Sequence, residues 1–234
     1  MKSWARCGAT LAATVALCAG PGAVWAQASA PSPAGRAKAE GDTLLAAAKA
    51  GDLFDNLTTG DGVGIKLKHR ASGLICEFNA GFATNSVIVF DSAQRGDEIA
   101  CSTGGPAGDR TLYATRAPGR TLDQAFAHDL AEVKRSHPGA QDYDLPRAAV
   151  DGPILSLLER PPMPLSRTAR FIADHTFTSV SSAMVGDWSL EFRYTCPEER
   201  QDLAAAILQP TLWVATLAQI AKVPINLVDP KQAV

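Results

Sequence analysis

Catalytic motifs with a defined spacing are missing from this sequence. The 234-residue chain contains no G-x-S-x-G nucleophile elbow, no H-E-x-x-H zinc motif and no G-x-x-x-x-G-K-[ST] phosphate loop. The Gly-rich stretch STGGPAGDR (102–110) is followed by an expected strand, whereas a phosphate cradle opens a helix. The sequence therefore predicts neither a catalytic residue nor a cofactor.

The histidines do not form a metal-binding pair either. None of them lies three or four residues from another, so no two share one helix face at ligand spacing. His69 alternates with Ile65 and Leu67 in a strand pattern, which is typical of a core or edge histidine. The sequence predicts no metal, and a zinc site built from distant residues is the alternative. The histidines are His69, His128, His137 and His175.

The N-terminal segment indicates export. Two basic residues, Lys2 and Arg6, precede the apolar run CGATLAATVALCAG and the small-residue end AVWAQA, which is the order of a secretory signal peptide. We expect a signal peptide over residues 1–26, with cleavage after Ala26 or after Ala28. The alternative is a lipoprotein acylated at Cys18, although Leu17 stands where a small residue is expected.

Export determines how the cysteines are interpreted. Cys76 in GLICEF and Cys101 in DEIACST lie in short apolar segments that one predicted strand separates. Two flanking strands of a sheet could bring their Cα atoms within the range of about 4.4–6.8 Å that a disulfide needs, and disulfides persist outside the cytoplasm. We predict a Cys76–Cys101 disulfide, with buried thiols as the alternative. Cys196 stays free, either buried or made reactive by the helix expected after Pro197.

The rest of the chain is expected to form one soluble domain. Residues 27–40 are rich in Ala, Pro and Ser and are predicted to be a disordered tether. Residues 41–229 are enough for a single domain with one core. No stretch after the signal peptide is interpreted as a transmembrane segment, which needs about 20 apolar residues.

The charge argues against two classes of partner. Loss of residues 1–26 leaves 20 of the 22 basic residues against 24 acidic ones. Nucleic acids and anionic membranes favour basic patches, so a mildly acidic, mixed surface argues against both as partners. The expected partner is a protein or small molecule of the cell envelope.

Hydrophobic periodicity predicts an α+β domain with an antiparallel sheet and helices packed on it. A helix follows Asp42 as N-cap, and Thr121 with Gln124 forms a capping box for a helix over 121–136. Thr195 is expected to cap a terminal helix that Pro210 kinks or splits. Strands are expected at IKLKHR, GLICEFN, SVIVFD, EIACST and TLYATR, and residues 167–195 are expected to form a three-stranded meander.

The last meander strand carries the binding candidates. Trp188, Leu190, Phe192 and Tyr194 alternate with Ser189, Glu191, Arg193 and Thr195. The aromatic face is either the core side of the sheet or a surface for an aromatic ligand or peptide. The polar face is either a pocket wall or a cross-strand ion pair. The possible binding residues are Trp188, Arg193 and Tyr194.

The stretch FTSVSSAMVGDWSLEFRYTCP (177–197) and the helix after it resemble the closing half of PsbP-like α/β/α sandwich domains. The chain also looks like small exported proteobacterial proteins without an assigned activity. The resemblance covers residues 60–222 and implies an accessory or binding protein without catalytic residues. The expected function is thus a non-catalytic binding or accessory protein of the periplasm, and the alternative is an exported hydrolase whose site is assembled from distant residues.

The first prediction concerns processing. The exported protein should begin at Gln27 or Ser29 and carry no lipid, because either site satisfies the small-residue rule of signal cleavage. Intact-mass spectrometry of the protein from the envelope measures this directly. A chain that begins at Cys18 and bears acyl groups would contradict it.

Overall fold

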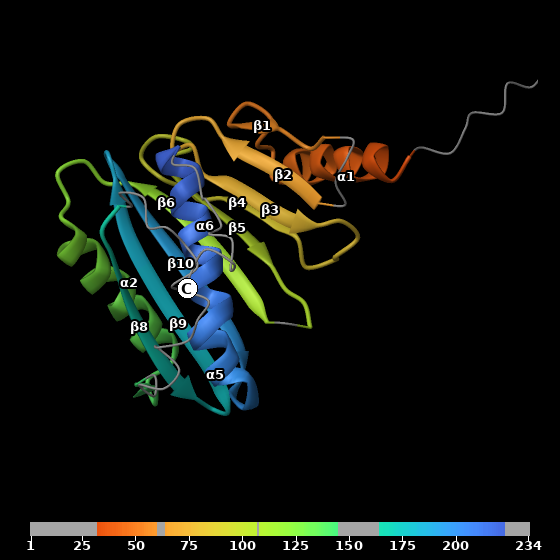
Figure 1. Ribbon diagram of the computed structural model, residues 1–234. Coiled ribbons are helices and arrows are strands. Elements are labelled where there is room, and N and C mark those ends of the chain that lie inside the picture. The colour runs from red at the N-terminus through yellow and green to blue at the C-terminus, as the bar shows by residue number, and fades with distance from the viewer. Residues whose placement is uncertain (1–31, 60–63, 107, 145–163, 223–234) are drawn as a thin grey trace, which may run out of the picture. The chain divides into compact units, whose positions relative to one another are not determined.

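A computed structural model describes residues 32–59, 64–106, 108–144 and 164–222 (Figure 1). Its strands form two sheets in which all neighbours are antiparallel, with the orders β1-β2-β3 and β4-β5-β6-β10-β9-β8-β7. The predicted α+β class with antiparallel pairing is confirmed. The small sheet comprises β1 (Phe54–Asn56), β2 (Gly64–His69) and β3 (Ile75–Asn79). The large sheet comprises β4 (Ser86–Val89), β5 (Glu98–Thr103), β6 (Asp109–Arg116), β7 (Gln141–Asp142), β8 (Ser166–Ala173), β9 (Thr176–Val185) and β10 (Trp188–Pro197).

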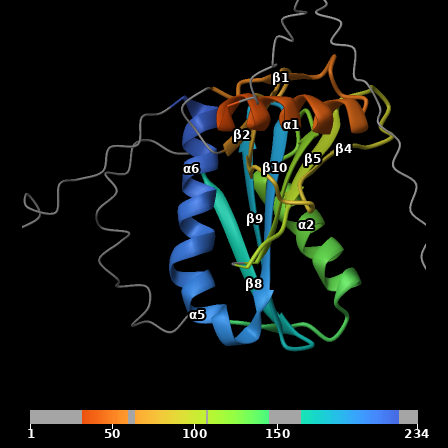
Figure 2. The ribbon, with the colours of Figure 1, turned by 90° about the vertical axis from the view of Figure 1, so that its right-hand side faces the viewer.

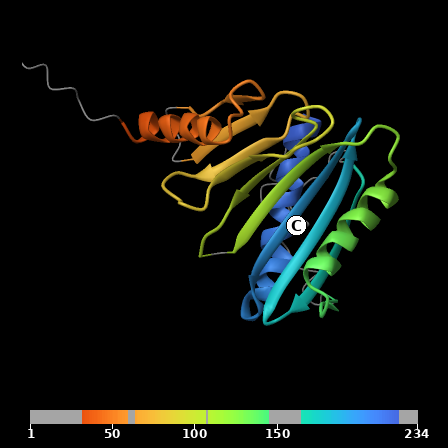
Figure 3. The ribbon, with the colours of Figure 1, turned by 180° about the vertical axis from the view of Figure 1, so that it is seen from behind.

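Two helices cover opposite faces of the large sheet (Figures 2 and 3). On one face, Val133 of α2 (Leu122–Ser136) packs against Phe171 and Val180 in a small apolar cluster. On the other face, Trp213 of α6 (Gln209–Ala221) stacks on Phe192, with ring centroids 6.1 Å apart. The sheet is therefore a middle layer, and its central strand β10 has side chains under cover on both sides.

The small sheet shares the larger core with the α6 face. Side chains of β2 and β3, among them Leu67 and Phe78, belong to one buried cluster with Ile99 of β5 and Leu190 of β10. The helix α1 (Pro33–Ala47) packs on β1 and β2 at the edge of this cluster. The larger core thus lies between the two sheets and α6, and the α2 side holds the small cluster around Val133.

The predicted Cys76–Cys101 disulfide is present and joins the two sheets. Its Cα atoms are 5.8 Å apart, and 25 positions separate the two residues in the sequence. Cys76 belongs to β3 and Cys101 to β5, so the bridge spans stacked sheets and not two flanking strands of one sheet. Cys196 is free and buried, as predicted.

Local sequence signals predicted α2 and the meander of β8, β9 and β10 correctly. Thr121 and Gln124 form both hydrogen bonds of the capping box of α2. Asp174 and His175 have φ values of 48° and 59° at the first meander turn, as a two-residue hairpin of the I′ type requires. The second turn lies at Gly186, whose φ is 58°.

The first helix begins earlier than the sequence indicated. Ser32 is the N-cap, and its Oγ accepts a hydrogen bond of 3.1 Å from the backbone N–H of Gly35. Residues 33–40 are therefore helical and not part of a tether, because Pro33 suits a first helical position and Ala37 is buried. Asp42 lies inside the helix and is not its cap. Residues 27–31 lie outside the described part of the chain.

The terminal helix also starts differently. Thr195 is not a cap, because it lies in β10 and pairs with Asp109 and Thr178 across both ladders. The chain turns only after Pro197, through a 3₁₀ turn η1 (Glu198–Arg200), the short α5 (Gln201–Leu203) and a π turn η2 (Ala204–Leu208). The π turn comes just before Pro210, which cannot donate to the preceding turn, so the predicted interruption is confirmed.

This helical stretch is more apolar than the sequence interpretation allowed. Glu198–Ala221 is long and apolar enough to cross a membrane by length and composition, with a mean hydropathy of 1.5 in its most apolar window. In this structure its Trp213, Leu217 and Ala218 are buried, and Trp213 lies on the large sheet. Core helices and membrane helices share this composition, so the stretch does not decide between them.

The second prediction follows from the disulfide. The mature protein, unfolded without reductant, should show one free thiol, which peptide mapping should assign to Cys196. Reduction, or Cys76→Ser, should lower the free energy of unfolding by roughly 2–4 kcal/mol, because the unfolded loop regains its freedom. The Cys76→Ser/Cys101→Ser double variant should lose little more than either single variant, since both remove one bond. Three free thiols in protein taken from the cell envelope would refute the bridge.

Candidate functional site

A polar hollow of about 490 Å³ lies between α2 and the part of the large sheet near β5, β6 and β10. We call it the α2 hollow. It has a size typical of small-molecule sites. The strands contribute Glu98, Tyr113, Thr115, Ser189, Glu191 and Arg193, the helix and its approach contribute Arg120, His128, Asp129 and Glu132, and Phe90 follows β4.

The alternation of β10 places an ion pair on the floor of the hollow. Glu191 and Arg193 point to the α2 face, because Leu190 and Phe192 occupy the core face. The Arg193 Nε donates to Glu191 Oε1, and the two side chains are only 25% and 10% exposed. The pair is thus largely shielded from water, unlike the surface pairs elsewhere on the chain.

An aromatic wall adjoins this pair. The guanidinium of Arg193 lies over the ring of Tyr113, 5.0 Å from its centroid. The ring of Phe90 stacks on Tyr113, with centroids 6.3 Å apart and an interplanar angle of 28°. The hollow therefore combines charged groups with an apolar surface, as small-molecule sites do.

A second buried carboxyl belongs to the helix. Asp129 is 5% exposed and lies between the buried Ala125 and Val133 at four-residue spacing. Its Oδ2 accepts a hydrogen bond of 2.6 Å from the Ser182 hydroxyl on β9. Asp129 is therefore a carboxylic acid in the buried stripe of α2, whose other members, Ala125 and Val133, are apolar.

The two carboxyls are held in an environment that favours protonation. Burial, and next the charge of Asp129, raise the pKa of Glu191 from its ordinary 4.5 to about 7, against the opposing effect of Arg193. Burial also raises the pKa of Asp129, while the Ser182 hydroxyl lowers it. The negative charge of Asp129 opposes the ionisation of Glu191, so the two carboxyls do not titrate independently.

The three predicted binding residues do not form one site. Arg193 lines the α2 hollow, whereas Trp188 lines a separate hollow of about 420 Å³ and Tyr194 an apolar one of about 250 Å³. Leu190, Phe192 and Tyr194 are 1–2% exposed, so the aromatic stripe is mainly the core side of the sheet. A binding role for Trp188 and Tyr194 stays a prediction.

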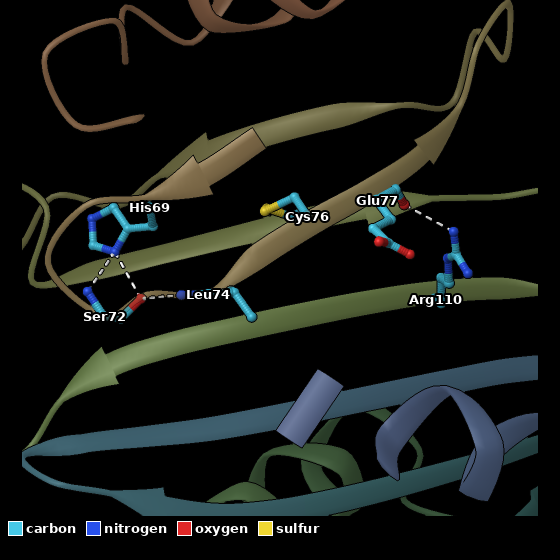
Figure 4. Close-up of a disulfide and its surroundings, with 7 residues drawn as sticks. His69, Ser72, Leu74, Cys76, Glu77 and Arg110 are labelled. Atoms are coloured by element: carbon cyan, nitrogen blue, oxygen red, sulfur yellow. Dashed lines mark hydrogen bonds between the residues drawn. A yellow bond between two sulfur atoms is a disulfide. The ribbon is translucent and has the colours of Figure 1, made fainter. Parts of the chain in front are cut away.

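His69 is in hydrogen-bonding distance of a serine but does not activate it. Its ring is fully buried, and Nδ1 lies 2.9 Å from Ser72 Oγ, which also accepts from the Leu74 N–H (Figure 4). Burial lowers the pKa of His69 to about 4. The imidazole edge meets Trp188 in a T-shaped contact at 5.5 Å. Ser72 itself lines none of these hollows, so the contact fixes the β2–β3 turn.

Cys196 is not in a reactive setting. It lies in β10 and not at a helix start, it is 3% exposed, and burial raises the pKa of its thiol. The described part of the chain holds no group of three or more His, Cys, Asp or Glu side chains that could bind a metal ion.

Sequence reasoning found Arg193 and Glu191 but missed Asp129. The signal was present, because Asp129 falls four residues after Ala125 and four before Val133, inside the buried stripe. A charged residue at a buried helix position is uncommon unless it has a partner or a function. Its partner Ser182 lies far along the chain, so the sequence did not reveal the pair.

No protein-family model matches the sequence, and no curated protein matches it. The interpretation of the α2 hollow therefore depends on its geometry and chemistry.

The third prediction concerns Glu191 and pH. Because its folded pKa of about 7 is above its ordinary 4.5, the unfolded chain releases this proton first, and stability falls as the pH rises between these values. The free energy of unfolding of the wild type, relative to Glu191→Gln, should fall by roughly 3 kcal/mol across this window. Urea titrations at a series of pH values measure the difference. Parallel curves for the two proteins would show that Glu191 titrates normally.

Proposed function

We propose that this chain is an exported, soluble and non-catalytic binding protein of the periplasm, and that the α2 hollow holds a small molecule. The observation that carries the proposal is a hollow of about 490 Å³ with the shielded Glu191–Arg193 pair on its floor and the Phe90–Tyr113 stack beside it. Removing charged groups from water costs free energy of folding, and binding of a partner or a ligand is a reason to retain such groups. Their placement at a concave surface favours the ligand.

Export has separate support. The basic, apolar and small-residue order of the N-terminal segment is that of a signal peptide, and this segment lies outside the described residues. The Cys76–Cys101 disulfide suits an oxidising compartment such as the periplasm. The PsbP-like resemblance, a proposal about the family, agrees with an accessory or binding role.

A hydrolase is the second candidate, and one observation favours it. Glu191 and Asp129 are two carboxyls in one hollow whose pKa values are both raised, which is the setting of a general acid. Ser182, the serine that is hydrogen-bonded to Asp129, is fully buried and donates to that carboxylate, so it is not placed as a nucleophile. Binding without turnover is therefore preferred.

The fourth prediction tests binding. Thr115→Trp should fill the hollow from β6, because Thr115 is half-buried and lines it. Wild-type protein isolated from its native envelope should release a small molecule on denaturation, detected as the mass difference between native and denaturing spectra. Thr115→Trp should release none. Thr176→Trp, at a half-buried strand threonine outside the hollow, is the matched control and should release the same molecule.

Three results would count against the proposal. A molecule that Thr115→Trp retains as well as the wild type would place the site elsewhere. Turnover of the released molecule, abolished by Glu191→Gln, would assign the hollow to the hydrolase instead. Wild-type protein without any bound molecule would contradict binding as its function.

A further inference from the structure

Building on the proposed function, we propose that the α2 hollow selects an organic cation, an ammonium group on a small apolar or aromatic body, and places it between Asp129 and Glu191. Four features support the choice: the free oxygens of two buried acids, the charge balance of the lining, the aromatic wall, and the proton held in the empty hollow.

Each buried acid has one oxygen that is still available. Asp129 uses Oδ2 for the Ser182 hydroxyl, and Glu191 uses Oε1 for the Arg193 guanidinium. Within the described residues no hydrogen bond reaches Asp129 Oδ1 or Glu191 Oε2. The two residues are 5% and 8% exposed and line the same hollow. Both free oxygens are accessible to solvent, so a ligand with several N–H donors could bind them in place of water.

The charge of the lining favours a positive ligand. Three carboxyl groups, from Glu98, Asp129 and Glu191, face the guanidinium groups of Arg120 and Arg193 and the imidazole of His128, whereas Glu132 is paired with Arg135 on its own helix. Arg193 is already paired with Glu191 and lies on Tyr113, so it is not free to neutralise Asp129. An ammonium group would restore the balance, whereas a carboxylate or phosphate would meet two buried acids.

The aromatic wall determines the rest of the ligand. Phe90 and Tyr113 form a stacked pair at one side of the hollow. Such a wall favours an apolar or aromatic body, and aromatic faces also attract cations. A bare metal ion has no apolar body to cover the rings of this wall. The recognised group is therefore an amine attached to a hydrocarbon or ring.

A proton takes the place of the cation when the hollow is empty. The groups that face Glu191 are Asp129, Glu132 and His128 from α2, Arg120 before it, Glu98 and Tyr113 from β5 and β6, and Arg193 on its own strand. Burial and the charges of Asp129 and Glu132 raise the pKa of Glu191 to about 7 against the effect of Arg193, and burial raises the pKa of Asp129. A cation that binds between them must displace the proton, so affinity should increase as the pH rises towards 7 and then level off.

Calorimetry with three matched probes tests the charge requirement. The probes are 2-phenylethylammonium, neutral 2-phenylethanol and anionic phenylacetate, which share one ring and differ in the polar end. At about pH 8, where Glu191 is ionised, the ammonium should bind at least about tenfold more tightly than the alcohol, and phenylacetate should bind least. Near pH 6, binding of the ammonium should release protons, seen as heats that change with the ionisation enthalpy of the buffer.

Variants locate the binding. Glu191→Gln and Asp129→Asn should each weaken the ammonium at least about tenfold and leave the alcohol nearly unchanged. Asp129→Asn keeps an acceptor for Ser182, so it is the variant that best retains the fold. Asp123→Asn is the matched control, because Asp123 lies on the same helix, is 72% exposed and pairs with Arg167 away from the hollow. It should leave the affinity unchanged.

The results of these experiments distinguish a failure of the cation proposal from a failure of the proposed function. If phenylacetate or the alcohol binds as tightly as the ammonium, and Thr115→Trp abolishes that binding, the hollow is a ligand site but not a cation site. If the ammonium does not bind, the cation proposal is wrong, and the molecule released from native protein still decides the function. If Asp123→Asn weakens the ammonium as much as Asp129→Asn, a general surface charge accounts for the binding.

Discussion

The central strand β10 imposes the constraint on which the rest of this structure depends. It lies between β6 and β9, and both of its faces are covered, so successive side chains must suit two different surroundings. Leu190 and Phe192 enter the core below α6, whereas Glu191 and Arg193 enter the region below α2. Because the period of a strand is two residues, a slip of one position would exchange an apolar core for an ion pair.

The cover on both faces of β10 also explains why Asp129 and Glu191 are buried. Apolar contacts of Val133, Phe171 and Val180 hold α2 against β8 and β9, and this attachment brings Asp129 over the neighbouring strands. Ser182 then fixes the carboxyl, and Arg193 fixes Glu191. The helix is thus anchored to the sheet by its apolar contacts and by the Ser182–Asp129 hydrogen bond.

The features that could be predicted were those set by neighbours in the sequence. The alternation of Trp188 to Thr195, the capping box at Thr121 and the two short turns predicted the meander and α2 with nearly correct ends.

The expectations that failed concerned segments whose structure depends on distant parts of the chain. Thr195 has the signature of a cap, yet the ladders to Asp109 and Thr178 extend β10 past it. Residues 33–40 are helical because Ala37 and Leu45 reach a core that later strands build. The α2 hollow joins residues from α2, β5, β6 and β10, so no local pattern could show it.

The disulfide has a further consequence for how the chain withstands damage. The loop between β4 and β5 lies inside the covalent ring that Cys76 and Cys101 close, and it contains the exposed Arg95. A protease that cuts there would open the ring without separating its ends, because each fragment carries one of the two cysteines. The N-terminal fragment would keep α1 and the small sheet, and it would stay attached to the strand that follows the cut. The chain could be nicked at this loop and still behave as one molecule until its surroundings became reducing.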